Sequence, residues 1–139
     1  FADNFAQPSV VSNVLFDNEN PEIIILAPAN NEIVYGASIS YSLSENLKEG
    51  KIMWKKKEGK FSLMRLILSL FSFLASDSKE TDMVEEELTK GDHIKIVPYN
   101  QTELKTGKIY SLTIQGIDMG GNIGNSAIIQ EIQVMNSSK

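Results

Sequence analysis

Few side chains in this sequence are of the types that carry out catalysis. Cysteine is absent, and His93 is the single histidine among 139 residues. The chain therefore lacks the residues for a thiolate zinc site, a cysteine nucleophile or a disulfide framework, and one histidine leaves little for a His-based metal site or a Ser-His-Asp triad. No glycine-rich phosphate loop follows a predicted strand, and the acidic run Glu85–Glu87 is typical of a solvated face rather than of paired catalytic carboxylates. We expect a protein that is not an enzyme and holds no cofactor.

Oxygen ligands gather in the polar stretch that runs from Asp17 to Pro21. Asp17, Asn18 and Glu19 offer the carboxylate and amide oxygens that calcium prefers, so a calcium site is one interpretation of this stretch. The other interpretation is an acidic linker without metal. Proline cannot donate to a β ladder, so Pro21 indicates a boundary between structural units.

Trp54 and a run of lysines are the remaining residues that could bind a ligand. An exposed tryptophan can stack on a sugar ring, whereas an inward-facing one fills the core between two sheets. Lys51 and Lys55–Lys57 could meet a polyanion, but lysines also protect edge strands from pairing with other chains, and we expect such an edge strand. The net charge of −5 and the pI of about 4.9 argue against a nucleic-acid partner.

Alternation of apolar and polar residues predicts about seven short strands separated by turns. In residues 37–44, Ile39, Tyr41 and Leu43 share one face while serines occupy the other, as in an antiparallel strand with one solvated face. The clearest predicted strands are residues 23–26, 37–44, 51–57, 93–97, 108–116 and 127–134. This pattern is typical of an all-β antiparallel sandwich.

Several of these features together resemble the bacterial Ig-like and fibronectin-type-III-like repeats of large exported surface proteins. The features are Trp54 on the third strand, the spacing of Leu104, Gly107 and Tyr110, and the turn Asp118–Asn122. The spacing resembles a tyrosine corner, in which the phenol hydroxyl bonds back to the backbone. The resemblance implies that Trp54, Leu104, Tyr110, Asp118 and Asn122 have structural roles.

The same resemblance implies a role outside the cell. We expect a spacer or adhesion module of an extracellular or cell-surface protein, with neighbouring repeats of the same chain as partners and a protein or carbohydrate as a further ligand. The alternative is a carbohydrate-binding accessory module of an exported glycoside hydrolase, which would need Trp54 or Tyr99 exposed. The fold by itself does not decide between them.

Residues 61–75 depart from the strand pattern and predict an inserted helix within 60–76. The polar residues Ser62, Arg65, Ser69, Ser72 and Ser76 follow helical spacing, and the other positions are apolar. A helix of this length is about 22 Å long, too short to cross a bilayer core of about 30 Å. It could cap the sandwich, contact a partner or lie on a membrane surface, although Arg65 alone supplies few of the cations such a surface helix carries. The residues assigned to partner contact are Phe61, Leu66, Leu70 and Phe73.

The sequence also predicts where the domain begins and ends, and what residues 77–88 form. Residues 1–17 resemble the closing segment 118–134 and are predicted as the last strand of a preceding repeat, with 18–21 as a linker. The sandwich then spans 22–135, and 136–139 form a tail.

Residues 77–82 are predicted as a solvated loop. Residues 83–88 could form a strand or a capped helical turn, and we favour the strand.

Overall fold

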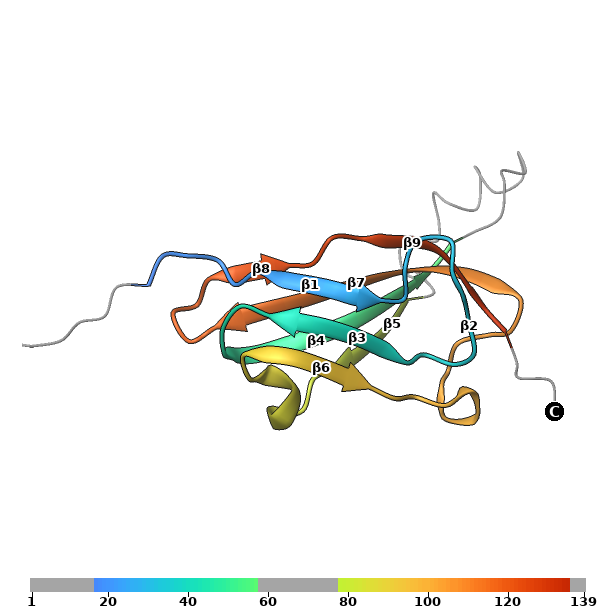
Figure 1. Cartoon of the computed structure of the whole chain (residues 1–139), viewed down its shortest axis with the longest axis horizontal. Helices are drawn as coiled ribbons and strands as arrows, with labels where there is room; N and C mark the ends of the chain where they lie inside the picture. Colours follow the sequence, from blue (N-terminus) through green and yellow to red (C-terminus); the bar gives the residue numbers. More distant parts are fainter. Residues whose placement is uncertain (1–16, 58–77, 136–139) are drawn as a thin grey trace, which may run out of the picture.

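The protein is an all-β sandwich, as the sequence predicts, in a computed structural model that describes residues 17–57 and 78–135 (Figure 1). The strands are β1 (Ile23–Ala27), β2 (Ile33–Val34), β3 (Ile39–Leu43), β4 (Leu47–Lys56), β5 (Ser78–Asp82), β6 (Gly91–Lys95), β7 (Lys108–Asp118), β8 (Ile123–Asn125) and β9 (Ile129–Val134). Two short 3-10 helices, η1 (Glu85–Leu88) and η2 (Tyr99–Gln101), lie between strands. Each strongly alternating segment of the sequence forms a strand.

The strands form two sheets that face each other. The smaller sheet has the order β1-β3-β6, and both of its pairings are antiparallel. The larger sheet has the order β2-β9-β7-β4-β5, with β8 paired to one end of β7. Its pairings are antiparallel except for β2, which runs parallel to β9. The strands follow the long axis of the domain, so residue 17 and residue 135 lie at opposite ends of it (Figure 1).

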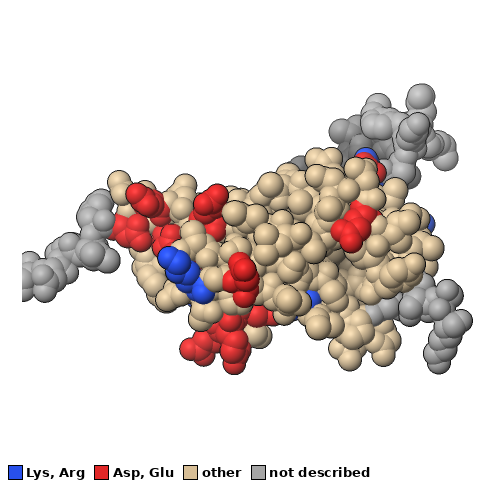
Figure 2. Space-filling view, in the orientation of Figure 1, with Lys and Arg blue, Asp and Glu red and all other residues tan. Residues whose placement is uncertain are grey.

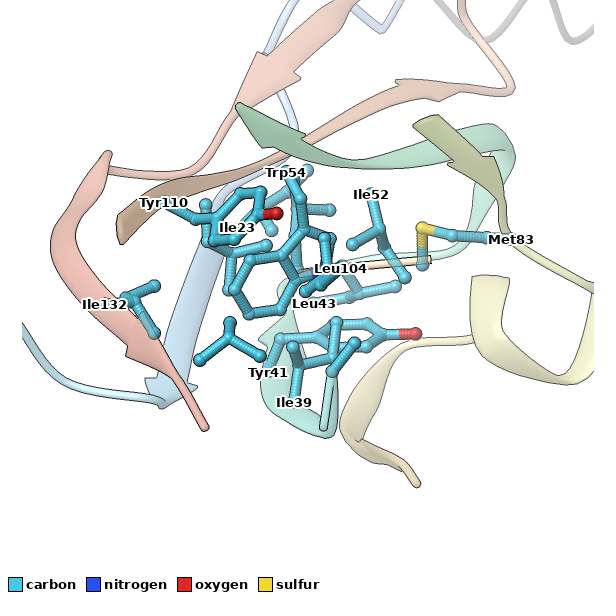
Figure 3. Close-up of a cluster of buried hydrophobic side chains, with 14 of the residues drawn as sticks. Ile23, Ile39, Tyr41, Leu43, Ile52, Trp54, Met83, Leu104, Tyr110 and Ile132 are labelled. Carbon is cyan, nitrogen blue, oxygen red and sulfur yellow. The ribbon is translucent and has the colours of Figure 1, made fainter. Parts of the chain in front are cut away.

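The core consists of the inward-facing side chains of both sheets (Figure 3). Trp54 on β4 is 4% exposed, and its ring meets the Tyr110 ring edge to face, with centroids 6.4 Å apart. Tyr41 on β3 faces the same core and is fully buried. Such aromatic side chains bury large apolar areas, and edge-to-face pairs add to that stabilisation.

The segment before β7 is fixed to that strand by a tyrosine hydroxyl. The Tyr110 hydroxyl accepts a hydrogen bond of 2.9 Å from the Lys105 backbone N–H, while the preceding Leu104 packs into the core. Gly107 stands between them with a φ of 71°, where a side chain would strain the backbone. This is the contact that a tyrosine corner makes.

Three local predictions are wrong. Residues 78–82 form strand β5 rather than a loop; as an exposed edge strand, it needs no apolar face and shows no alternation. Residues 85–88 form η1 rather than a strand, because the Glu87 carboxylate accepts a 3.0 Å hydrogen bond from the Val84 N–H and closes a helical turn. The lysines of β4 are not on an edge strand, since β4 lies between β7 and β5. Lys51 and Lys55 are exposed on the outer face of the larger sheet, opposite the face that buries Trp54, whereas Lys56 is half-buried and shares the strand parity of Trp54.

Three predictions fall on residues outside the described part, one of them the tail at 136–139. The other two are the helix at 61–75, with its contact residues Phe61, Leu66, Leu70 and Phe73, and the strand of a preceding repeat at residues 1–17, of which the structure describes residue 17 alone. Within residues 17–57 and 78–135, no helix has both the length and the apolar character needed to cross a membrane.

Candidate functional site

Acidic side chains gather at the end of the sandwich where the chain reaches β1 (Figure 2). Asp17 precedes the linker, Glu45 lies in the turn between β3 and β4, and Asp118 ends β7. Their carboxylates lie within 4.8 Å of one another, and in the described part of the chain they form the one such group of three. The topology explains the convergence, because β3 ends, β4 begins and β7 ends at this edge of the sandwich.

Asp118 holds the turn between β7 and β8 in place. Its carboxylate, buried from solvent, accepts hydrogen bonds from the Asn122 backbone N–H at 2.8 Å and from the Asn122 side-chain amide at 2.9 Å. Gly121 within this turn has a φ of 91°, a conformation that glycine adopts without strain. The pair Asp118 and Asn122 therefore determines the shape of this end of the domain.

Burial and hydrogen bonding move the pKa values of this group in opposite directions. Burial raises the pKa of Asp118, but hydrogen bonds from Asn122, Gly121 and Gly120 outweigh it, so the net pKa lies below its usual value. Partial burial and the neighbouring carboxylates of Asp17 and Asp118 raise the pKa of Glu45. The pKa of Glu45 is therefore shifted upward and that of Asp118 downward at this end of the sandwich.

The Glu45→Gln substitution is expected to raise the unfolding temperature at pH 7. A carboxyl group whose pKa is higher in the folded state than in the unfolded state favours folding as the pH falls. It opposes folding once the pH rises above its folded-state pKa. The gain should shrink as the pH falls and vanish below 4.5, the ordinary value for glutamate, where the parent residue is protonated in both states. Thermal unfolding followed by circular dichroism between pH 4 and pH 8 measures the difference.

A Glu45→Gln variant that is less stable than the parent at pH 7 would contradict this account.

Carboxylate oxygens are the ligands that calcium takes, so Asp17, Glu45 and Asp118 are the described residues that could hold such an ion. Added calcium supplies the control. A rise in unfolding temperature that the parent chain shows and Glu45→Gln lacks would indicate that a cation, rather than a proton, relieves the repulsion.

The linker that leads into β1 is fixed to the same end of the sandwich. The Asn122 side-chain amide donates a hydrogen bond to the Asp17 carbonyl oxygen at 3.2 Å. Pro21 is buried and lies so close to β8 that a Cβ atom at Gly124 would overlap the Pro21 carbonyl oxygen. We call residues 17–22, with the side chains and glycine that contact them, the N-terminal junction.

Two further hydrogen bonds join the N-terminal junction to β3. The Glu22 N–H donates to the Ser44 hydroxyl at 2.9 Å, and the Ser44 N–H donates to the Glu22 carbonyl oxygen at 3.0 Å. Hydrogen bonds therefore hold both ends of the stretch from Asp17 to Glu22, and close packing holds its middle. The segment cannot swing independently of the domain without breaking these contacts.

Of the three residues that the sequence grouped as a calcium site, Asp17 belongs to the carboxylate group of Glu45 and Asp118. Asn18 and Glu19 are exposed on the linker, and the charge of Glu19 also raises the pKa of Glu45. The Glu19 N–H donates to the Asp17 carboxylate at 3.2 Å. Glu45 was missed because it stands in an ordinary polar turn, and only the strand pairing brings it to Asp17.

The other candidate binding residues do not belong to this carboxylate group. Trp54 is buried, so its ring offers no surface on which a sugar could stack, and the Tyr99 side chain is outside the described part. Lys57 forms an ion pair with Glu131 on β9. His93 stacks on Tyr41 at a centroid distance of 5.1 Å, and its Nε2 lies 2.6 Å from the Thr89 carbonyl oxygen.

No protein-family model matches this chain, and no curated protein matches it in sequence.

Proposed function

We propose that this chain is a non-enzymatic spacer or adhesion module of an exported bacterial protein, with an Ig-like fold and neighbouring modules of the same chain as its partners. The single observation that carries the proposal is the path of the chain. Residue 17 lies at one end of the long axis and residue 135 at the other (Figure 1). A module connected in this way sets a distance between its neighbours.

The strand pairing suits a module that carries load. Force applied through the two ends runs parallel to β1 and β9, so the hydrogen bonds that hold these strands are sheared together. β9 is paired on both sides, antiparallel to β7 and parallel to β2. Backbone bonds from Gln133 to Glu32 and from Met135 to Val34 extend the contact with β2 to the last described residues.

The N-terminal junction supports the same proposal at the other end. Its contacts with Asn122, Gly124 and Ser44 would transmit the direction of a preceding module to the body of the sandwich. The Tyr110 hydroxyl bond to Lys105 adds support for the Ig-like assignment, because tyrosine corners recur in such domains.

Single-molecule force measurement tests this proposal, since forced unfolding reports the barrier to unfolding. We expect a single unfolding event when the chain is pulled from its two ends, with an extension of about 3.3–3.6 Å per unfolded residue. In the matched control, the force acts on the same chain between a cysteine introduced by Lys105→Cys and the C-terminus. Because Lys108 lies opposite Val134 in the β7–β9 pair, that geometry unzips the strands one bond at a time.

The proposal predicts a higher unfolding force for the end-to-end geometry than for the unzipping geometry. Equal forces, or a lower force in the end-to-end geometry, would contradict a load-bearing role. The chain contains no natural cysteine, so each handle attaches at one defined position.

A further inference from the structure

The smaller sheet ends in a regular strand, β6, whose protection as an edge consists of Asp92 and the inward-facing Lys95. β6 pairs with β3 alone among the described strands. The pairing covers five consecutive residues without a bulge, from Ile39 opposite Lys95 to Leu43 opposite Gly91. An edge strand that is regular over this length presents a row of N–H and C=O groups to any strand placed beside it.

Exposed isoleucines add an apolar contact to this edge. Ile94 and Ile96 are 77% and 75% exposed, the highest values among the large hydrophobic residues of the described part. Ile94 is exposed between the half-buried residues 93 and 95, and Ile96 keeps the same parity directly after the strand. Figure 2 shows mostly uncharged side chains over the middle of this face of the molecule. A strand added to β6 would cover both isoleucines.

The other sheet edges are protected against pairing. β5 consists of polar and charged residues, and its Glu80 and Lys79 form ion pairs with Lys51 and Glu103. β1 carries a bulge and is followed by a proline, while β2 and β8 contain only two and three residues. Bulges, charges and short length are the devices that keep edges from pairing. β6 itself carries Asp92 and Lys95, but Ile94 and Ile96, which directly follows the strand, leave positions 94 and 96 uncharged.

We propose that β6 is a self-association edge, which pairs antiparallel with β6 of a second copy of this chain about a two-fold axis. An antiparallel register centred on Lys95 places Ile94 of each copy directly opposite Ile96 of the other. Four isoleucines then form one cluster on the outer face of a continuous six-strand sheet. Directly opposed β-branched residues stabilise antiparallel pairs, and a two-fold contact requires such self-complementarity.

The charges of β6 are compatible with this register. The two Lys95 residues would face each other on the inner side, but each already forms an ion pair with its own Glu87 at 2.8 Å. Both side chains of that pair are largely buried, which keeps the lysine charge compensated. A register centred on Ile94 would instead place Asp92 opposite Ile96. The proposal is independent of the spacer function, since it concerns lateral contact between copies.

Sedimentation equilibrium of the full chain tests the proposal. We expect a concentration-dependent dimer, and we expect the double variant Ile94→Lys/Ile96→Lys to raise its dissociation constant by at least about tenfold. The matched control is Ile128→Lys, because Ile128 is 57% exposed and precedes β9 of the other sheet. Both substituted sites are exposed, and circular dichroism verifies that each variant is folded.

Cross-linking tests the register directly. When copies carrying Ile94→Cys are mixed with copies carrying Ile96→Cys, disulfides should join unlike copies faster than like copies, because directly opposed strand positions lie within disulfide reach. A chain that stays monomeric at all concentrations would overturn the proposal. Association that survives Ile94→Lys/Ile96→Lys would overturn it too, and if that association is lost when residues 60–76 are replaced by a Gly-Ser loop, the contact belongs to that segment.

Discussion

Replacing Trp54 with alanine should destabilise this domain more than any other single truncation in its core. Trp54 is 4% exposed and meets Tyr110 edge to face between the two sheets (Figure 3). Truncating a buried tryptophan removes its transfer free energy and leaves a cavity, which together cost about 3–5 kcal/mol. A typical domain has about 5–15 kcal/mol of folding stability, so the variant should be partly or wholly unfolded at 37 °C.

Urea unfolding at 25 °C measures the effect, with Trp54→Phe and Lys55→Ala as controls. The phenyl ring retains part of the packing, so Trp54→Phe should cost less than the alanine variant. Lys55 follows Trp54 on the same strand with its side chain exposed, and its truncation should change the unfolding free energy by less than about 0.5 kcal/mol. A loss of less than 1 kcal/mol for Trp54→Ala would show that the ring does not fill the core.

Placing valine at Gly124 should release the N-terminal junction from the sandwich. A Cβ atom at this position would overlap the Pro21 carbonyl oxygen, a backbone atom that cannot rotate away. Residues 21 and 22 would have to move, which breaks the paired hydrogen bonds between Glu22 and Ser44. Overpacking of this kind costs about 1–3 kcal/mol. Valine favours strand geometry, so the cost would come from the steric overlap alone.

The control for this substitution is Ile123→Val on the same short strand. Ile123 is 51% exposed, so the change leaves the packing against Pro21 intact. Thermal unfolding should show a lower transition temperature for Gly124→Val than for the control. Equal stabilities for the two variants would mean that the contact between Pro21 and β8 does not hold the junction.

The sequence predicts the fold well where burial is one-sided. The alternation through Ile39, Tyr41 and Leu43 indicates which face of β3 is buried, and all three side chains lie in the core. β5 escapes this reasoning because a strand at the edge of a sheet, exposed along its length, needs no apolar face. η1 is not predicted because its helical turn depends on one local hydrogen bond, from the Val84 N–H to the Glu87 carboxylate three residues later. The alternation of residue types does not show whether this bond outweighs the tendency of the segment to form a strand.

The candidate site was only partly predictable, for a different reason. Asp17 and the Asp118–Asn122 turn stand out in the sequence as a polar linker and a turn. Their contact, from the Asn122 amide to the Asp17 carbonyl oxygen, joins residues 105 positions apart in the chain. Glu45 carries no local signal, and it joins them only because the β3–β4 turn reaches the same end of the sandwich. Pairing between distant strands, which the alternation alone does not specify, creates this group.

The proposed spacer role requires that the N-terminal junction is fixed to the domain, so that the module would set a distance and a direction between its neighbours. Spin labels at Asn20→Cys and Met135→Cys test it most directly, because the chain has no other cysteine. Double electron–electron resonance should give one narrow distance distribution in the parent background and a broadened one in Gly124→Val. A broad distribution in the parent background would contradict the claim, since the junction would then act as a flexible tether.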